Sequence, residues 1–269
     1  LMSYLYLGGG EDKGRKIVES HPLKTKTRIC RYWFIAQSFL TCLPVPKFNY
    51  QNRDLSKAAI FFPAIGGLIG VINYGLYFLL RFFNTGNWLS AFILITSSIV
   101  LTRGLHLDGW ADICDALFST HNVQRRRDIL KDSRLGTFGV VGIFLLLSFK
   151  AVALSENKLP VFLILSPMAG RTAALIAGGL FRPFQQEKKS LGEEFIGQIP
   201  WQVVGIWLGI LILSPLFWKR DFYPLKATLI FFVGWLFCKM MEKNFQGLNG
   251  DAVGAVIELV ETLFLFLGR

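Results

Sequence analysis

The residues that could carry chemistry are concentrated in the segment GLHLDGWADICDAL, residues 104–117. Asp108, Asp112 and Asp115 lie there at intervals of four and three residues. At about 100° per residue, these intervals place all three carboxylates on one face of a helix. Like charges on one face repel one another unless a cation lies between them. Oxygen ligands without a cysteine or histidine cluster favour Mg²⁺ or Mn²⁺, so we expect the three aspartates to bind a divalent metal, with Mg²⁺ as the cofactor.

His106 lies two residues before Asp108 and therefore on the far side of the same helix. It joins the aspartates only if the first turn of the helix is irregular. A polar helix face in contact with water is the alternative interpretation of the three aspartates. The apolar segments around them favour a functional site, because ionisable residues in such segments are costly and usually paired or functional.

A second acidic set lies in the segment GLNGDAVGAVIELVE, residues 247–261. Asp251 and Glu258 are seven residues apart and share one face of a helix, and Glu261 lies about 80° from that line. Carboxylates inside an apolar helix imply a cation or a basic partner. The metal of the first site and Arg171 are the two candidates for that partner.

Basic residues near these acids are candidates for binding phosphate. Arg171 lies beside Gly170 within an apolar segment, so we expect a phosphate or a carboxylate to approach it closely. Asp132 and Arg134 precede a glycine-bearing turn at 136–139, where backbone N–H groups can face an anion. The expected phosphate-binding residues are Lys131, Arg134 and Arg171, and the expected supporting acids are Asp132, Asp251, Glu258 and Glu261.

The elements that must position these side chains are membrane helices. Of the 269 residues, 52% are hydrophobic and 25 are Phe, which is far above the content of an ordinary soluble domain. Apolar runs occur at 58–80, 88–102, 137–155, 159–181, 201–218 and 225–241, before a last helix that carries the second acidic set. A shorter run at 32–45 ends on two prolines and is typical of an interfacial or re-entrant helix. We therefore expect an all-α, polytopic integral membrane helical bundle of about six to eight membrane segments.

The formal net charge of +11 reflects a surplus of Lys and Arg, and the positions of these residues predict how the chain is oriented. Residues 1–31 are polar and basic and predict a cytoplasmic N-terminal arm, and residues 32–269 are expected to form a single membrane-embedded catalytic domain. The basic loop 121–139 is expected on the cytoplasmic side of the membrane, and Arg125, Arg126 and Arg127 are interpreted mainly as a topology signal. The aspartate face, which precedes this loop, is expected on the same side. In a membrane protein, such a surplus favours anionic lipid and phosphate partners over nucleic acid.

The acidic and basic sets together favour transfer of a phosphoryl group from a nucleotide linked through a diphosphate. The sequence contains no Walker loop, no GxGxxG and no hydrolase nucleophile elbow, which argues against ATP-driven and serine chemistry. The four cysteines have no paired spacing, so neither a disulfide framework nor a zinc site is indicated.

Six segments resemble the cobalamin synthase family, the adenosylcobinamide-GDP ribazoletransferases. They are LTCLPVP at 40–46, FFPAIGGLIG at 61–70, GLHLDGWADICDAL at 104–117, LKDSRLGTFGVVG at 130–142, GRTAAL at 170–175 and NGDAVGAVIELVE at 249–261. The resemblance implies a Mg²⁺-dependent enzyme of the bacterial inner membrane, with its active site facing the cytoplasm. It would join α-ribazole, or its 5′-phosphate, to adenosylcobinamide-GDP and release GMP.

On this resemblance, Asp108, Asp112 and Asp115 hold Mg²⁺ against the diphosphate, and Asp132 is a further candidate ligand. Arg134 and Arg171 neutralise charge on the transferred group. The proton of the attacking hydroxyl goes to one of the carboxylates or to His106, and the sequence does not choose between them. It also does not decide between a monomer and a homo-oligomer.

Two alternatives remain at this stage. A CDP-alcohol phosphotransferase also uses spaced aspartates around Asp-Gly, but its pattern places Ala-Arg after that pair, where this chain has Ala111 and Asp112. A cation-coupled transporter would bind ions at its intramembrane acids and usually contains an inverted repeat. No second copy of the aspartate segment occurs in the other half of the chain.

Overall fold

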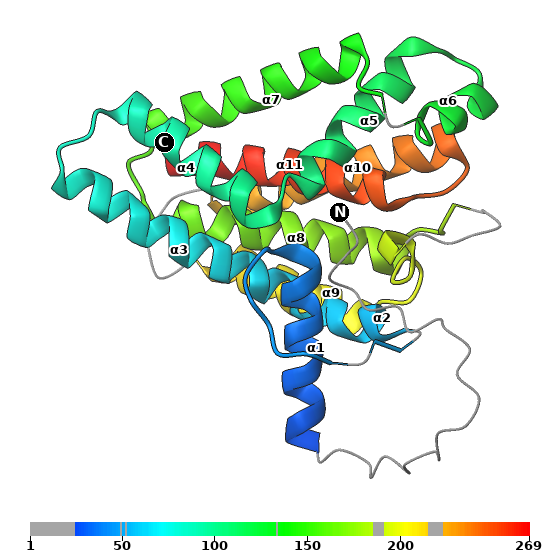
Figure 1. Cartoon of the computed structure of the whole chain (residues 1–269), viewed down its shortest axis with the longest axis horizontal. Coiled ribbons are helices and arrows are strands. Elements are labelled where there is room, and N and C mark those ends of the chain that lie inside the picture. Colours follow the sequence, from blue (N-terminus) through cyan, green and yellow to red (C-terminus); the bar gives the residue numbers. More distant parts are fainter. Residues whose placement is uncertain (1–24, 49, 52, 133, 185–190, 215–222) are drawn as a thin grey trace.

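The chain folds into a bundle of helices (Figure 1). The computed structural model describes residues 25–48, 50–51, 53–132, 134–184, 191–214 and 223–269. Within these ranges no β-strand forms, and a single isolated bridge joins Pro183 and Leu248. The α-helices are α1 (Thr25–Leu40), α2 (Asp54–Ala58), α3 (Phe62–Phe82), α4 (Asn87–Thr102), α5 (Leu105–Ser119), α6 (Val123–Ile129), α7 (Thr137–Ser155), α8 (Phe162–Leu180), α9 (Trp201–Leu213), α10 (Tyr223–Phe245) and α11 (Gly250–Leu265). Short 3₁₀ helices include η1 (Ala59–Phe61), η2 (Leu191–Glu193) and η4 (Phe266–Gly268).

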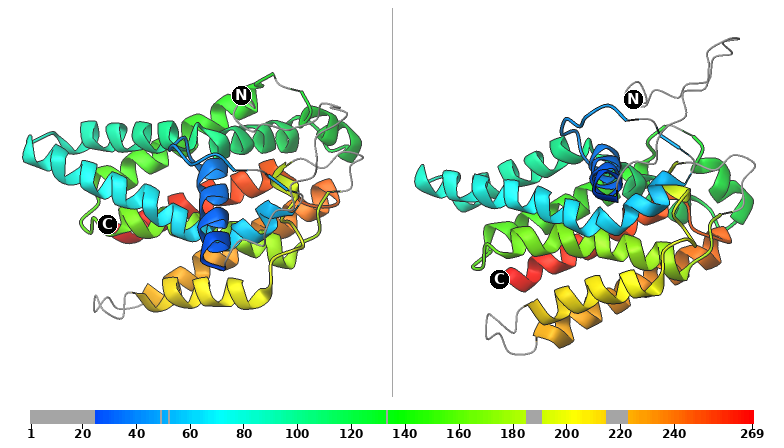
Figure 2. Two further views of the ribbon diagram at one scale, coloured as in Figure 1. Left: turned by 60° about the horizontal axis from the view of Figure 1, so that its bottom comes forward. Right: turned by 90° about the horizontal axis from the view of Figure 1, so that it is seen from below.

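Helix α8 lies at the centre of the bundle. Its residues from Ser166 to Gly178 are almost all buried, and α3 and α11 both pack along it. In the right-hand view of Figure 2, α8 lies between α3 and the pair formed by α9 and α10. The close packing of α3 depends on glycine, because a Cβ at Gly70 would lie 2.5 Å from the Cα of Ile164. The absence of a side chain at this position therefore permits the close approach of α3 to α8.

The chain turns sharply between α4 and α5. The two helices are bent by 94° at a break formed by Arg103 and Gly104, which both have left-handed backbone conformations, with φ of 56° and 67°. The Arg103 guanidinium also donates to the carbonyl oxygen of Ser38, at 3.0 Å, and so ties the break to the end of α1. The apolar α4 thus leads directly into the aspartate-bearing α5, in a geometry typical of a broken span or a re-entrant loop.

Four helical segments are long and apolar enough to cross a bilayer: Asp54–Phe82, Thr137–Ser155, Phe162–Leu180 and Tyr223–Phe245. A fifth is added if α4 and α5 together form one bent span. The prediction of an all-α polytopic membrane protein is confirmed, but the count over the described residues is lower than six to eight. The reason is length, since α9 has 13 residues and the acid-bearing α11 has 16.

The N-terminal region differs in part from its prediction. Residues 1–24 of the expected basic arm lie outside the described residues, whereas residues 25–31 belong to α1. Figure 1 and the left-hand view of Figure 2 show α1 crossing the long direction of the bundle. Asp54, at the start of α2, forms an ion pair with Arg31 and so joins the two helices.

The basic segment after α5 is not simply a loop. Its residues 123–129 form α6, in which Arg126 is buried and donates to the carbonyl of Thr120 at 2.8 Å and to the side chain of Asn244. Arg127 donates to the carbonyl of Phe245 at 2.8 Å. These two arginines therefore fasten α6 to the end of α10, a structural role that the sequence interpretation as a topology signal did not include.

Candidate functional site

The acidic face of α5 is at the end of the bundle where α5 meets the beginning of α11. Asp108 is exposed, and Asp112, one turn later, is half-buried. Between them Gly109 touches α11 so closely that a Cβ there would lie 2.8 Å from the carbonyl oxygen of Asp251. Asp251 is therefore brought beside the two aspartates of α5, although it lies far from them in the sequence.

Asp251 is oriented by the residue that begins its helix. Asn249 caps α11 by accepting a hydrogen bond from the backbone N–H of Ala252 at 2.9 Å. Its amide group donates to the Asp251 carboxylate at 2.6 Å. The charges of Asp251 and Asp108, and more weakly that of Asp115, act on Asp112. The three carboxylates thus form one electrostatically coupled group, which we call the outer acidic face.

Glu193 is a further acid near this face that sequence reasoning did not select. It lies in η2, which packs on α11, and its charge acts on Asp251. The chain around it is held by the bridge between Pro183 and Leu248, where the N–H of Phe184 donates to the carbonyl of Leu248 at 2.7 Å. Glu193 reaches α11 through long-range contacts of η2 and the residues around it, so no local sequence pattern could have identified it.

The oxygen atoms of the outer acidic face suit Mg²⁺ chemically, without forming a complete metal cage. Among the described residues, no three His, Cys, Asp or Glu side chains are grouped closely enough to hold a metal ion by themselves. Mg²⁺ commonly uses one or two carboxylates and completes its coordination with water and substrate phosphate. An open pair of aspartates fits that mode of binding.

Asp115 differs from the other two aspartates of α5. It is buried, and its two carboxylate oxygens accept hydrogen bonds from the backbone N–H groups of Gly136 and Gly139, each at 2.8 Å. These two groups belong to the start of α7. Asp115 therefore has protein partners on both oxygens, unlike the exposed Asp108.

The basic segment before α7 lies at the surface. Lys131 and Arg134 are exposed, and Arg134 donates to Asp132 through Nε at 3.0 Å and Nη2 at 2.6 Å. The hydrogen bonds from the Arg134 side chain lower the pKa of the Asp132 carboxyl below its usual value. Asp132 is therefore ionised at neutral pH and holds the guanidinium in one orientation.

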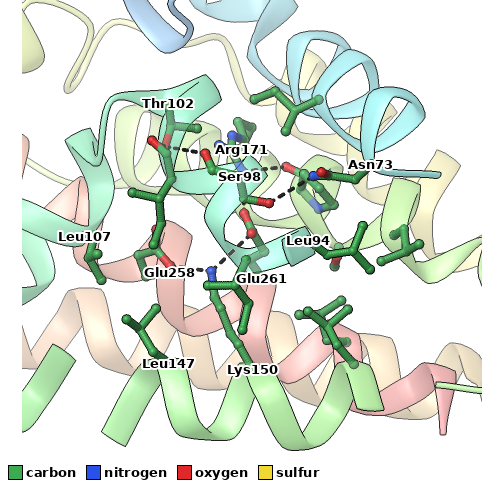
Figure 3. A pocket seen from close by; sticks show the side chains of 18 residues that line it. Asn73, Leu94, Ser98, Thr102, Leu107, Leu147, Lys150, Arg171, Glu258 and Glu261 are labelled. Atoms are coloured by element: carbon green, nitrogen blue, oxygen red, sulfur yellow. Dashed lines mark hydrogen bonds and ion pairs between the residues drawn. The ribbon is translucent and has the colours of Figure 1, made fainter. Parts of the chain in front are cut away.

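Arg171 lies in a different place, inside the bundle (Figure 3). It is only 2% exposed, and its guanidinium forms an ion pair with Glu261. Lys150 of α7 contacts both Glu258, at 2.5 Å, and Glu261, at 3.2 Å. The C-terminal acids Glu258 and Glu261 thus have cationic side chains as partners, and the pairing of Arg171 with a carboxylate matches one of the two alternatives left open by the sequence.

His106 belongs to the same buried group. It is 3% exposed, and its Nδ1 lies 3.4 Å from Nη2 of Arg171. We call Lys150, Arg171, Glu258, Glu261 and His106 the buried charge cluster. A cavity of about 40 Å³ beside it is further lined by Asn73 and Ser98, which are hydrogen-bonded to each other at 2.9 Å. This volume holds a few water molecules and excludes a nucleotide.

The structure therefore separates the predicted constellation into two groups. Asp108, Asp112 and Asp251 are together at the outer acidic face, and Asp115 on the same helix contacts the segment that follows Lys131, Asp132 and Arg134. Arg171, His106, Glu258 and Glu261 lie inside the bundle, where Lys150 completes a charge-balanced cluster with them. The periodicity argument that placed His106 opposite the aspartates agrees with this separation.

Comparison with known proteins supplies independent information. Residues 32–268 match the family model described as cobalamin-5-phosphate synthase. An adenosylcobinamide-GDP ribazoletransferase of Escherichia coli (strain K12) is 33% identical over 238 residues, which is 85% of this chain and 95% of that protein. Proteins of the same name from Brevibacillus brevis and Acetivibrio thermocellus are 32% and 34% identical, over 86% and 85% of this chain and 95% and 93% of their own lengths. No solved structure matches the chain.

Proposed function

The chain belongs to the cobalamin-5-phosphate synthase family, and from this premise we propose that it is an adenosylcobinamide-GDP ribazoletransferase. The enzyme joins α-ribazole, or its 5′-phosphate, to adenosylcobinamide-GDP and releases GMP, which assembles the nucleotide loop in cobalamin biosynthesis. The observation that carries this proposal is the family match over residues 32–268, which includes every residue of the outer acidic face. The apolar helices agree with an enzyme that acts within a membrane.

We propose that the outer acidic face binds Mg²⁺. Asp108 and Asp112 would hold the ion, as the sequence predicts, and the contact at Gly109 adds Asp251 to the candidates. When bound, Mg²⁺ would supply positive charge against the diphosphate oxygens and so lower the energy of the transition state. The hydrogen bond from Asn249 keeps Asp251 directed within this group.

The reaction exchanges one bond to phosphorus for another. A hydroxyl oxygen of α-ribazole bonds to the phosphorus nearer the cobinamide, and the bond from that phosphorus to the bridging oxygen breaks, so that GMP leaves with the electron pair. The hydroxyl proton passes to a carboxylate of the outer acidic face. Among the candidates for this proton, the carboxylates are favoured over His106, because the imidazole is buried against Arg171.

Lys131 and Arg134 are the proposed partners of the phosphate oxygens. Both are exposed, so a large substrate can reach them from outside the bundle. The ion pair with Asp132 holds the Arg134 guanidinium in place before substrate arrives. Arg171 has a different proposed role, because its pairing with Glu261 makes it part of the bundle interior and not a phosphate ligand.

The location proposed for this reaction is the inner membrane of a bacterium, with the outer acidic face toward the cytoplasm. The support is the positive-inside rule applied to the basic residues of α6 and of the segment after it. The two alternatives from the sequence have weaker support. The family match favours neither a CDP-alcohol phosphotransferase nor a transporter, and the charges of the buried cluster are already paired with one another.

The test is a reaction with the purified chain in lipid nanodiscs. Adenosylcobinamide-GDP, α-ribazole and Mg²⁺ should give GMP and a cobalamin product in equal amounts, and EDTA should abolish both. Asp112→Asn should lose most of this turnover, whereas Asp128→Asn, the same change on the exposed face of α6, should keep it. Absence of GMP from the intact chain with Mg²⁺ would refute the proposed activity.

A further inference from the structure

Asp115 makes a contact that its assignment to the metal does not explain. The Asp115 carboxylate belongs to α5 but lies against the start of α7. One of its oxygens accepts a hydrogen bond from the backbone N–H of Gly136, and the other accepts one from the N–H of Gly139. These groups are among the N–H groups that an α-helix leaves without partners inside itself. Asp115 therefore performs for α7 the capping that a side chain usually performs within its own helix.

The glycines of α7 are fitted to this carboxylate. A Cβ at Gly136 would lie 2.8 Å from Cγ of Asp115, and a Cβ at Gly139 would collide with Oδ2. Two turns into α7, a Cβ at Gly142 would lie 2.6 Å from Sγ of Cys114, the neighbour of Asp115. The segment GTFGVVG thus keeps one side free of side chains where α5 lies against it. The anion expected at the turn 136–139 is present, and it is the carboxylate of Asp115.

The contact determines where the basic segment lies. Gly136 follows Arg134 by two residues, and Arg134 itself is bound to Asp132. Fastening Gly136 and Gly139 to α5 therefore fixes Arg134 and Leu135, which directly precede Gly136, relative to the helix that carries Asp108 and Asp112. A buried charge with two hydrogen bonds from helix N–H groups is also well stabilised where it is.

We propose that Asp115 is a positioning residue and not a metal ligand: it fixes the start of α7, and with it Lys131 and Arg134, beside the outer acidic face. This inference rests on the proposed function of that face. It assigns to Asp115 an effect on the binding of the diphosphate substrate, exerted through Arg134. It leaves the metal to Asp108 and Asp112, with Asp251 as the further candidate.

Hydrogen exchange without metal or substrate tests the contact directly. In Asp115→Asn, one oxygen of the carboxylate is replaced by an NH₂ group that cannot accept a hydrogen bond, so the amides of 136–140 should exchange about tenfold faster or more. Asp112→Asn is the matched control, one turn earlier on α5, and should leave these amides unchanged. Equal exchange in Asp115→Asn and the wild type would overturn the proposal.

Kinetics then separate positioning from metal binding. Asp115→Asn should raise KM for adenosylcobinamide-GDP about tenfold and leave the Mg²⁺ concentration for half-maximal rate within twofold of wild type. Combining it with Arg134→Ala should add little to the KM of Arg134→Ala alone, because both changes act on one contact. A Mg²⁺ requirement raised as much as in Asp112→Asn, or additive effects on KM, would contradict the proposal.

Failure of this inference differs from failure of the proposed function. If the wild-type chain releases no GMP, the activity is wrong, and the exchange experiment still decides whether Asp115 holds α7. Gly139→Ala offers a second variant that leaves every carboxylate in place, and it should reproduce the faster exchange at 136–140. Normal exchange in Gly139→Ala would contradict the fitted contact.

Discussion

Neutralising Glu261 should destabilise the protein more than neutralising any other acid of the buried charge cluster. Glu261 forms ion pairs with two cations, Arg171 and Lys150, whereas among the described residues Glu258 pairs with Lys150 alone. In Glu261→Gln, the cluster keeps two positive charges and one negative charge. Removing one partner of a buried ion pair costs about 3–5 kcal/mol, because the other charge remains buried without compensation.

The loss of stability should be smaller in variants that leave the cluster closer to charge balance. Glu258→Gln should cost less than Glu261→Gln, since Lys150 keeps its contact with Glu261 at 3.2 Å. In the double variant Arg171→Gln with Glu261→Gln, the loss should be smaller than the sum of the two single losses by roughly 0.5–3 kcal/mol. Glu156→Gln is the control, because its ion pair with Arg269 lies on the surface and such pairs contribute about 0–1 kcal/mol.

The assay is thermal unfolding in nanodiscs, followed by the fluorescence of the seven tryptophans. At about 2–4 °C per kcal/mol for a chain of roughly this size, Glu261→Gln should lower Tm by about 6–20 °C and Glu156→Gln by at most a few degrees. Equal shifts for the buried and the surface glutamate would refute the reasoning. Strict additivity of Arg171→Gln and Glu261→Gln would refute the pairing of these two side chains.

Three further variants test other contacts. Gly109→Ala should lower the rate of GMP release at least about tenfold and lower the free energy of unfolding by about 1–3 kcal/mol, because its Cβ would lie 2.8 Å from the Asp251 backbone. Activity equal to wild type would contradict the contact between α5 and α11. Arg134→Ala, at an exposed position, should raise KM for the diphosphate substrate while changing stability by no more than about 0.5 kcal/mol, as measured by substrate titration and thermal unfolding. Arg126→Ala should lower the free energy of unfolding by about 2–3 kcal/mol, because its buried hydrogen bonds are lost, and should leave KM for the diphosphate substrate unchanged. A change confined to KM would show instead that Arg126 acts in substrate binding.

Local sequence patterns were sufficient to predict the helices and the shared face of the aspartates on α5. Apolar runs and the 3.6-residue period depend only on neighbouring residues, so the helical membrane class and the shared side of Asp108 and Asp112 could be predicted. The same period placed His106 on the opposite side of the helix, where it contacts Arg171. Length limited the prediction of spans, because an apolar run does not show where its helix begins and ends.

The partners of the charged residues could not be predicted in the same way. Arg171 and Glu261 are ninety positions apart, and only the packing of α8 on α11 brings them together. Glu193 reaches Asp251 because η2 packs on α11. Asp115 reaches α7 at Gly136 and Gly139, which the sequence predicts only as a turn. Each of these contacts depends on the arrangement of whole helices, which composition and spacing do not determine.

Metal binding to the outer acidic face is the central claim, and electron paramagnetic resonance of Mn²⁺ tests it most directly, since Mn²⁺ takes the same oxygen ligands as Mg²⁺. The chain in nanodiscs with adenosylcobinamide-GDP should bind one Mn²⁺. Asp112→Asn and Asp251→Asn should each weaken that binding at least about tenfold, while Glu156→Gln should leave it unchanged. Wild-type affinity in both aspartate variants would contradict the account.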